Sequence, residues 1–180
     1  MSRLNTYMEL SKFRISLFAT ISTAVGYILS TGRLSVGILI PVVGIFLLAC
    51  SSCALNQIQD REIDPKMNRT KNRPLPSGRM TVTAAFIFVL VTLFAGSVIL
   101  YVGANLLTMV LGLLALVWYN GIYTYLKRIT SLAVIPGAVV GAIPPMLGWA
   151  AGGRSILEPA ILSVAFLFFI WQVPHFWLLL

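Results

Sequence analysis

The chain has 180 residues, of which 58% are hydrophobic and 10% charged, and its mean hydropathy is +0.92. A soluble domain of this length carries far more surface charge, so the composition excludes an ordinary globular protein, a disordered chain and a disulfide scaffold. The 13 Lys and Arg residues outnumber the 5 Asp and Glu residues and give a net charge of +8, but they are grouped between apolar runs. We therefore expect an integral protein of a lipid bilayer, with no nucleic acid among its partners.

Six apolar runs follow one another along the chain. Each is close to the ~20 residues that a helix needs to cross ~30 Å of hydrocarbon. The runs lie at roughly 15–31, 34–55, 81–101, 104–123, 132–151 and 156–180. The sequence predicts an all-α fold, a polytopic transmembrane helical bundle that forms a single domain over residues 1–180.

The basic residues indicate the orientation of the bundle. Eleven of the 13 lie before the first run, after the second run or after the fourth run, and only Arg33 and Arg154 lie elsewhere. Lys and Arg are enriched in cytoplasmic loops, so this distribution predicts a multi-pass protein with a cytoplasmic N-terminus.

The fifth run is rich in Pro and Gly, with Pro144 and Pro145 side by side. Two interpretations are open. The prolines break or bend the helix and leave carbonyl groups facing protein or a wet cavity, or small residues such as Gly137 and Gly141 allow a neighbouring helix to pack closely.

The loop after the second run carries three of the five acidic residues. On a helix that continues from this run, Asn56, Asp60 and Asp64 are spaced i, i+4, i+8 and lie on one face, whereas Glu62 points away. Two carboxylates at this spacing repel each other, and a bound cation removes the repulsion. Carboxylate oxygens suit Mg²⁺, so we expect a metal site at Asn56, Asp60 and Asp64.

The same loop is strongly basic. Arg69, Lys71 and Arg73 can donate charge-assisted hydrogen bonds to a diphosphate. Acids that hold a metal beside bases that hold phosphate are typical of a phosphate-ester site. The alternative is a solvated loop with internal ion pairs, whose bases follow the positive-inside rule and contact lipid head groups.

Two further clusters contain polar residues at helical spacing. At the end of the fourth run, Asn120, Tyr123 or Thr124, and Lys127 share one helical face on the same side of the membrane as Asp60; an interfacial Tyr belt with a snorkelling Lys is the alternative. The sixth run contains His175, the only His of the chain. An intramembrane His can ligate iron or move a proton, or it can satisfy a carbonyl freed by a nearby Pro.

Three separated runs together resemble one family. They read NQIQDREID from Asn56, YTYLKRIT from Tyr123 and QVPHFW from Gln172. The first resembles the first aspartate motif of the UbiA superfamily of intramembrane prenyltransferases, and the other two are similar to signatures of its haem-farnesylating branch. The matches occur in the expected order and span nearly the whole chain.

The resemblance implies a reaction and a location. It implies Mg²⁺-dependent transfer of a farnesyl group from farnesyl diphosphate to the vinyl group of haem B, giving haem O. It also implies the inner or plasma membrane of the cell, with haem A synthase or terminal oxidase assembly as further partners.

The resemblance also assigns roles to residues of this chain. Asn56, Asp60 and Asp64 match the metal and catalytic positions, and Lys127 is a catalytic candidate that contacts the diphosphate. The substrate-binding candidates are Arg61, Arg69, Lys71, Arg73, Tyr123, Arg128 and His175.

Two departures from the family pattern stand out. Family members carry about nine transmembrane helices and a second acidic motif, whereas six helices are expected here before Leu180, so we expect a C-terminally incomplete domain. The family also commonly has a Pro between two basic residues where the first helix begins, and here the run is Lys12-Phe13-Arg14. We expect this change to alter the start of the helix without touching the chemistry.

Two other functions are compatible with the sequence. The first is prenyl transfer to an aromatic or quinone precursor, which uses the same diphosphate chemistry. The second is a small-molecule transporter, which needs polar residues in mid-membrane. The acids instead cluster at one end of the predicted spans, which favours the enzyme.

Overall fold

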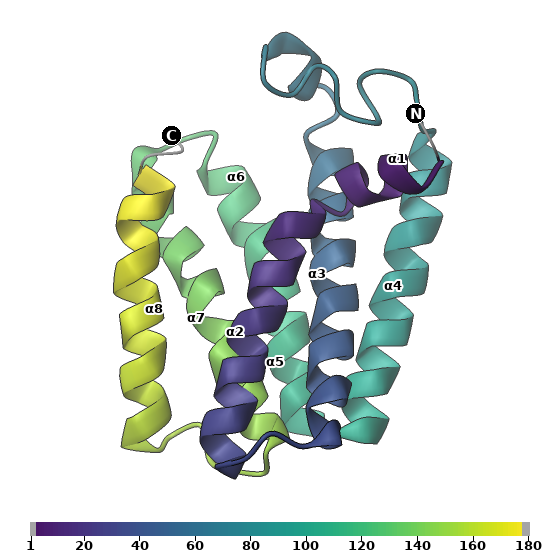
Figure 1. Cartoon of the computed structure of the whole chain (residues 1–180). Helices are drawn as coiled ribbons and strands as arrows, with labels where there is room; N and C mark the ends of the chain where they lie inside the picture. Colours follow the sequence, from purple (N-terminus) through teal and green to yellow (C-terminus); the bar gives the residue numbers. More distant parts are fainter. Residues whose placement is uncertain (1–2, 178–180) are drawn as a thin grey trace.

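The computed structural model describes residues 3–177, with side chains to residue 174, and this part of the chain is helical without strands. The long helices stand side by side in a bundle (Figure 1). They are α2 (Phe13–Thr31), α3 (Leu39–Gln59), α4 (Val82–Gly103), α5 (Leu106–Val117), α7 (Val134–Ala151) and α8 (Pro159–Trp177). The shorter elements are α1 (Arg3–Leu10), η1 (Val36–Ile38), η2 (Asp64–Lys66), η3 (Trp118–Tyr123), α6 (Thr124–Leu126) and η4 (Ser131–Ala133).

The predicted all-α membrane bundle is confirmed. Five helical segments are long and apolar enough to span a bilayer, and they correspond to the first five predicted runs. These segments are Phe13–Thr31, Val36–Gln59, Val82–Gly103, Leu106–Leu126 and Ser131–Ala151. The sixth run forms α8, whose apolar part is shorter over the described side chains, at Pro159–Pro174.

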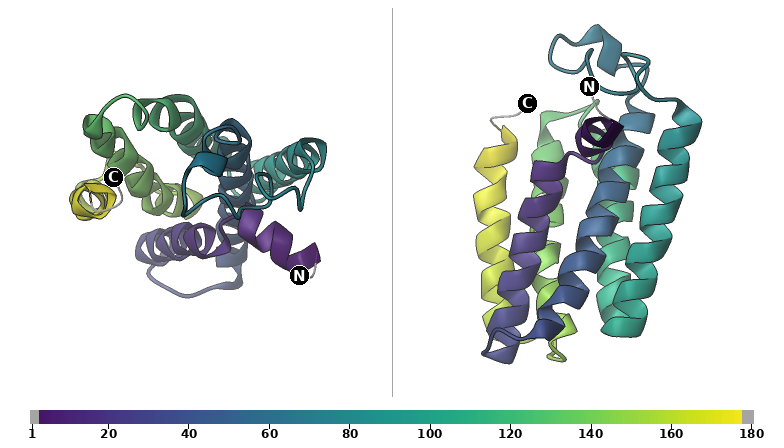
Figure 2. Two further views of the ribbon diagram at one scale, coloured as in Figure 1. Left: turned by 90° about the horizontal axis from the view of Figure 1, so that it is seen from above. Right: turned by 45° about the vertical axis from the view of Figure 1, so that its right-hand side comes forward.

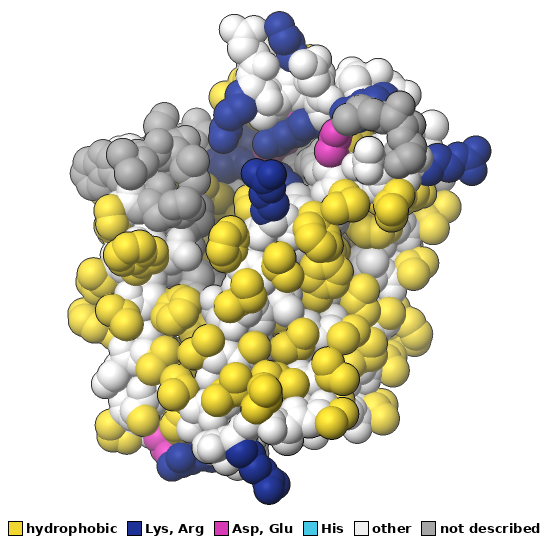
Figure 3. All heavy atoms as spheres, in the orientation of Figure 1, with side chains coloured by type: hydrophobic (Ala, Val, Ile, Leu, Met, Phe, Trp, Pro, Cys, Tyr) yellow, Lys and Arg dark blue, Asp and Glu magenta, His cyan; other side chains and the backbone are white. Residues whose placement is uncertain are grey.

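The core lies where α3, α4, α5 and α7 meet. Leu48, Leu100 and Leu147 are the best-buried members of this apolar cluster, each at most 1% exposed. Large apolar side chains also cover the outside of the bundle, as the yellow spheres of Figure 3 show. An apolar outer surface is what a protein solvated by lipid requires, because hydrocarbon does not penalise it.

In the fifth run the close-packing interpretation applies. α7 is one helix that contains Pro144 and Pro145, and it packs tightly against α2 and α8. A Cβ atom on Gly148 would lie 1.9 Å from the carbonyl oxygen of Thr23 in α2, and one on Gly141 would lie 2.6 Å from Gln172 in α8. Gly141 and Gly148 therefore allow the close contacts, whereas the predicted pair was Gly137 and Gly141.

One helix, α1, was not anticipated, because it is short and of mixed polarity. It lies across the end of the bundle near the N-terminus, where residues 61–81 form the adjoining loop (Figures 1 and 2). Gln57 Nε2 donates to the carbonyl oxygens of Glu9 and Leu10, at 2.9 Å each, and so joins α1 to α3. We call this end, formed by α1 and residues 61–81 and 127–131, the basic end, because most Lys and Arg side chains gather there (Figure 3).

Candidate functional site

The site begins where α3 ends. α3 stops at Gln59 and Asp60 caps it with φ −91° and ψ 3°, so the prediction of a helix through Asp64 is wrong. From Asp60 the chain turns into the short helix η2, in which Pro65 has no N–H to donate to the preceding turn. One turn of the predicted face remains: Asn56 Nδ2 donates to Asp60 Oδ2 over 3.1 Å.

Two basic side chains that follow the fourth span form ion pairs with Asp60. Lys127 Nζ lies 2.6 Å from Asp60 Oδ2, and Arg128 Nη2 lies 2.5 Å from Asp60 Oδ1. The Asp60 residue is only 6% exposed. The two polar clusters of the sequence, almost 70 residues apart, therefore form one site.

A widened helical turn supplies the residues opposite Asn56. The fourth span passes through the π-helical turn η3 before α6, and such turns are frequent at functional sites. Thr124 Oγ1 accepts from Asn56 Nδ2 at 3.1 Å and donates to the carbonyl oxygen of Tyr119 at 2.9 Å. Of the two predicted alternatives, Thr124 is the one that contacts Asn56. Tyr123 stacks on Tyr119 at 5.3 Å and lies under the Lys127 ammonium at 5.9 Å.

Lys12 is a site residue that the sequence analysis missed. Its Nζ atom donates to Asn56 Oδ1 over 2.9 Å. Lys12 joins α1 to α2 with φ 47° and ψ 53°, and it is the only non-Gly residue with positive φ in the described chain. A strained backbone of this kind persists where the surroundings hold it. The sequence does contain a signal for this role. Lys12 is a basic residue immediately before an apolar run, at the same predicted end of the bundle as Asp60.

Asp64 lies within the 61–81 loop, and its residue is 3% exposed. Arg73 Nη1 donates to both carboxylate oxygens, at 2.9 and 3.0 Å. The Thr70 hydroxyl donates to the Asp64 carbonyl oxygen at 2.8 Å and closes the loop. Arg73 is therefore the basic residue of this loop that contacts a predicted metal ligand.

Two of the other predicted bases of this loop have partners away from the two carboxylates. Arg61 pairs with the exposed Glu62 at 3.4 Å, and Lys71 donates to Asn68 at 3.2 Å. Arg69 is exposed on the same loop. His175 belongs to the last turn of α8, and its side chain lies outside the described residues.

Electrostatics at the site favour an ionised Asp60 carboxylate. Burial raises the pKa of the Asp60 carboxyl, but hydrogen bonds from Lys127 and Arg128 outweigh burial and hold its pKa below the ordinary value. Burial lowers the pKa of the Lys12 ammonium, and the charges of Arg73 and Lys127 lower it further. Four basic side chains thus surround two carboxylates, which leaves a surplus of positive charge for an anion.

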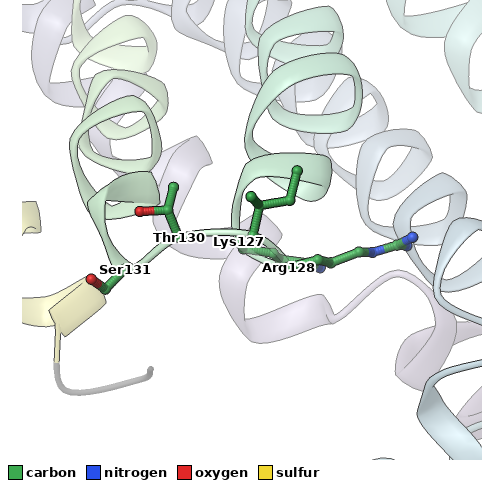
Figure 4. Close-up of a pocket in the computed structure, with 5 residues that line it drawn as sticks. Lys127, Arg128, Thr130 and Ser131 are labelled. Atoms are coloured by element: carbon green, nitrogen blue, oxygen red, sulfur yellow. The ribbon is translucent and has the colours of Figure 1, made fainter.

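The donor set fits a magnesium ion that is bound together with phosphate oxygens. Among the described side chains, no three His, Cys, Asp or Glu residues gather at one place. Mg²⁺ does not need a full set of protein ligands, since it is commonly held by one or two carboxylates plus substrate phosphates. At the basic end, a shallow open pocket of about 290 Å³ is lined by Lys127, Arg128, Ile129, Thr130 and Ser131 (Figure 4).

Comparison with known proteins identifies the family of the chain. Residues 19–180 match the UbiA prenyltransferase family. The chain belongs to the UbiA prenyltransferase family. Its bundle also resembles two solved structures of that fold, a digeranylgeranylglyceryl phosphate synthase (TM-score 0.80, 21% identity, 98% of this chain and 61% of that one) and a UbiA homolog from Archaeoglobus fulgidus bound to DMAPP and Mg²⁺ (TM-score 0.70, 19% identity, 89% and 59%).

Curated members of the UbiA family are similar in sequence. A protoheme IX farnesyltransferase of Cytophaga hutchinsonii is 41% identical over 98% of this chain and 62% of its own length, and one of Oleidesulfovibrio alaskensis is 36% identical over 94% and 60%. The mitochondrial protoheme IX farnesyltransferase of Arabidopsis thaliana is 40% identical over 94% of the chain and 40% of its own length. The chain thus spans about 60% of the length of the two bacterial relatives.

Proposed function

We propose that this UbiA-family chain transfers a farnesyl group from farnesyl diphosphate to a vinyl group of haem B, giving haem O for haem A synthase or terminal oxidase assembly. The observation that carries the proposal is the junction of Asp60 with Lys127 and Arg128 at one end of an apolar bundle. Curated relatives named protoheme IX farnesyltransferase support haem as the acceptor.

In this proposal the acids of the site hold the metal. Asp60 and Asp64 supply carboxylate oxygens, and Asn56 lies within hydrogen-bond distance of Asp60. Bound Mg²⁺ would withdraw charge from the diphosphate and so make it a better leaving group. Both carboxylates are nearly buried, and a site with little water strengthens their attraction for a cation.

The bases would stabilise the departing group. When the allylic C–O bond breaks, its electron pair remains on the diphosphate, and Lys127, Arg128 and Arg73 are placed to donate to those oxygens. The surrounding apolar helices keep water away from the allylic cation until the vinyl π electrons form a C–C bond with it. This bond leaves a cation on the other vinyl carbon, and a water molecule would then add there and release a proton. Tyr123, which already lies under Lys127, offers an aromatic face at the same place.

We further propose that the basic end faces the cytoplasm and that the membrane is the inner or plasma membrane. Basic residues are retained on the cytoplasmic side of spans. This orientation places the diphosphate site on the side from which a water-soluble diphosphate head group arrives.

The test is mass spectrometry of haem extracted from membranes that carry the chain and are supplied with haem B, farnesyl diphosphate and Mg²⁺. We expect farnesylated haem from the wild type and from Glu62→Ala, whose carboxylate is exposed, but not from Asp60→Ala or Asp64→Ala. A full-length relative serves as the positive control. A prenylated aromatic acceptor in place of haem would contradict the proposed acceptor, and wild-type rates in both Asp variants would contradict the metal assignment.

A further inference from the structure

The oxygens of the predicted metal set are already bonded to basic side chains. Asn56 Oδ1 accepts from Lys12, and the two oxygens of Asp60 accept from Lys127 and Arg128. Both oxygens of Asp64 accept from Arg73. A metal ion that ligates any of these oxygens therefore has a positively charged group beside it, and the two repel each other.

The orientation of the Asn56 amide follows from the chemistry of its neighbours. An ionised carboxylate can only accept hydrogen bonds, so the amide nitrogen must face Asp60. The amide oxygen then faces Lys12, which donates to it. The oxygen that would ligate a cation therefore points away from the Asp60 carboxylate, and the amide must turn before both residues can share one metal ion.

The backbone at Lys12 favours this arrangement. Lys12 has the left-handed conformation, which places its side chain between α1 and α2 beside Asn56. Ser11 is buried, and its backbone N–H bonds back to Tyr7 at 2.9 Å, so the turn that carries Lys12 is fixed. Lys12 can hold the Asn56 amide without contacting either carboxylate.

From these contacts we propose that Lys12 is a positioning residue that makes metal binding at this site depend on diphosphate. A divalent ion alone meets the repulsion of Lys12, Lys127 and Arg128. A diphosphate gives those cations new oxygen partners, which frees Asn56 and Asp60 for the metal. The two ligands then bind together, each strengthening the other by the same factor. This inference rests on the proposed function of the site and adds an order of assembly to it.

The experiment is equilibrium dialysis of Mn²⁺ against the chain in lipid nanodiscs, with and without inorganic diphosphate in both compartments. For the wild type we expect diphosphate to tighten Mn²⁺ retention on the order of tenfold or more. Tenfold is the lower bound, because a unit charge about 6 Å from a divalent ion contributes about that factor even at the dielectric constant of bulk water. Equal Mn²⁺ affinity with and without diphosphate would overturn the inference.

Lys12→Met supplies the decisive variant, because it is nearly isosteric and removes the charge. We expect it to bind Mn²⁺ alone about tenfold tighter than the wild type does, so that diphosphate adds less. A gain of affinity is a result that partial unfolding does not produce. Lys12→Arg is expected to restore the wild-type dependence, and Lys66→Met, which removes an exposed charge from the same end, is the matched control.

The outcomes separate this inference from the proposed function. If Lys12→Met leaves Mn²⁺ binding unchanged while the wild type still farnesylates haem, the positioning role is wrong and the function stands. If Lys127→Met also fails to increase the affinity for Mn²⁺ alone, the proposed competition between basic residues and metal is wrong. Loss of Mn²⁺ retention in Asp60→Asn would locate the measured metal at this site and support the inference.

Discussion

Asp60 illustrates how a charged residue is accommodated at the edge of an apolar bundle. A buried carboxylate is costly unless it is paired and hydrogen-bonded. Lys127, Arg128 and Asn56 supply those contacts. Removal of Asp60 would leave two cations without their partner, so its effect combines lost chemistry with lost stability. Thr124, a neutral partner of Asn56, allows the stability of the site to be tested without removing a charge.

Thr124→Val tests the hydroxyl that joins α6 to Asn56. The change keeps the shape of the side chain but removes the acceptor for Asn56 Nδ2 and the donor to Tyr119. Because Thr124 is fully buried, we expect a loss of about 1–2 kcal/mol in the free energy of unfolding, measured by SDS titration in detergent micelles. Thr124→Ser should recover most of it. A Thr124→Val protein as stable as the wild type would show that the contact contributes nothing.

At the scale of helices, small residues decide how closely elements approach. Lipid is as apolar as a leucine side chain, so membrane helices associate through close packing more than through burial of apolar surface. α2 and α7 achieve this with glycines on both sides: Gly148 meets the carbonyl of Thr23, and Gly26 meets the carbonyl of Pro145. α8 packs against α7 of this pair, and Lys12 of the site directly precedes the first residue of α2.

Gly148→Ala tests this contact. The new Cβ atom would lie 1.9 Å from the Thr23 carbonyl oxygen, so α2 and α7 must separate. We expect a destabilisation of about 2 kcal/mol, within the usual range for overpacking, as a lower midpoint of thermal unfolding in detergent. Gly121→Ala is the control, since its Cβ would meet only Val117 Cγ1 at 3.9 Å. Equal midpoints for the two variants would argue against the close contact.

For the whole molecule, charge distinguishes the two ends of the bundle. The basic end holds most Lys and Arg side chains (Figure 3). Arg33 and Arg154 lie in the loops that follow α2 and α7, at the opposite end. Arg154 pairs with Glu158 and lies over the Trp149 ring at 4.7 Å, which anchors the loop between α7 and α8. This difference in charge between the two ends supports the proposed orientation, with the basic end toward the cytoplasm.

Thiol labelling tests that orientation. Cys50 and Cys53 are both buried, so they can be replaced by Ala to leave a background without thiols. In inverted vesicles, whose cytoplasmic face is outward, we expect a membrane-impermeant maleimide to label Lys66→Cys but not Arg33→Cys, and the reverse in intact spheroplasts. Labelling of both positions from the same side would contradict the two-ended topology, and the reversed pattern would contradict the cytoplasmic basic end.

Much of the fold could be predicted because its determinants are local. The length and hydropathy of each run identify a membrane span without reference to any other run, and the five spans of the structure begin and end within a few residues of the predicted runs. The aspartate motif likewise lies within one loop, and its Asn56–Asp60 spacing survives as a hydrogen bond. Family membership followed from three such local runs.

The assembly of the site depended on contacts between elements. Periodicity placed Lys127 on the same side of the membrane as Asp60, but only the packing of the fourth span against α3 brings the two within 2.6 Å. Helical spacing also predicted that Asp64 would follow Asp60 on one face, whereas α3 ends at Gln59 and the Asp64 carboxylate accepts from Arg73. A sequence pattern gives the spacing of residues along one helix, but it does not give the distance between residues on two different helices.

The sequence by itself therefore determined the membrane class, the spans, the acidic motif and the family. Each of these depends on residues that are neighbours along the chain. Their composition and spacing decide whether a segment is favourable as a helix in the bilayer. Only the tertiary structure decided that Lys12 holds Asn56 and that Thr124 lies beside it. The reason is that α1, α3 and α6 meet at one end of the bundle, where helix packing and a left-handed residue set the distances.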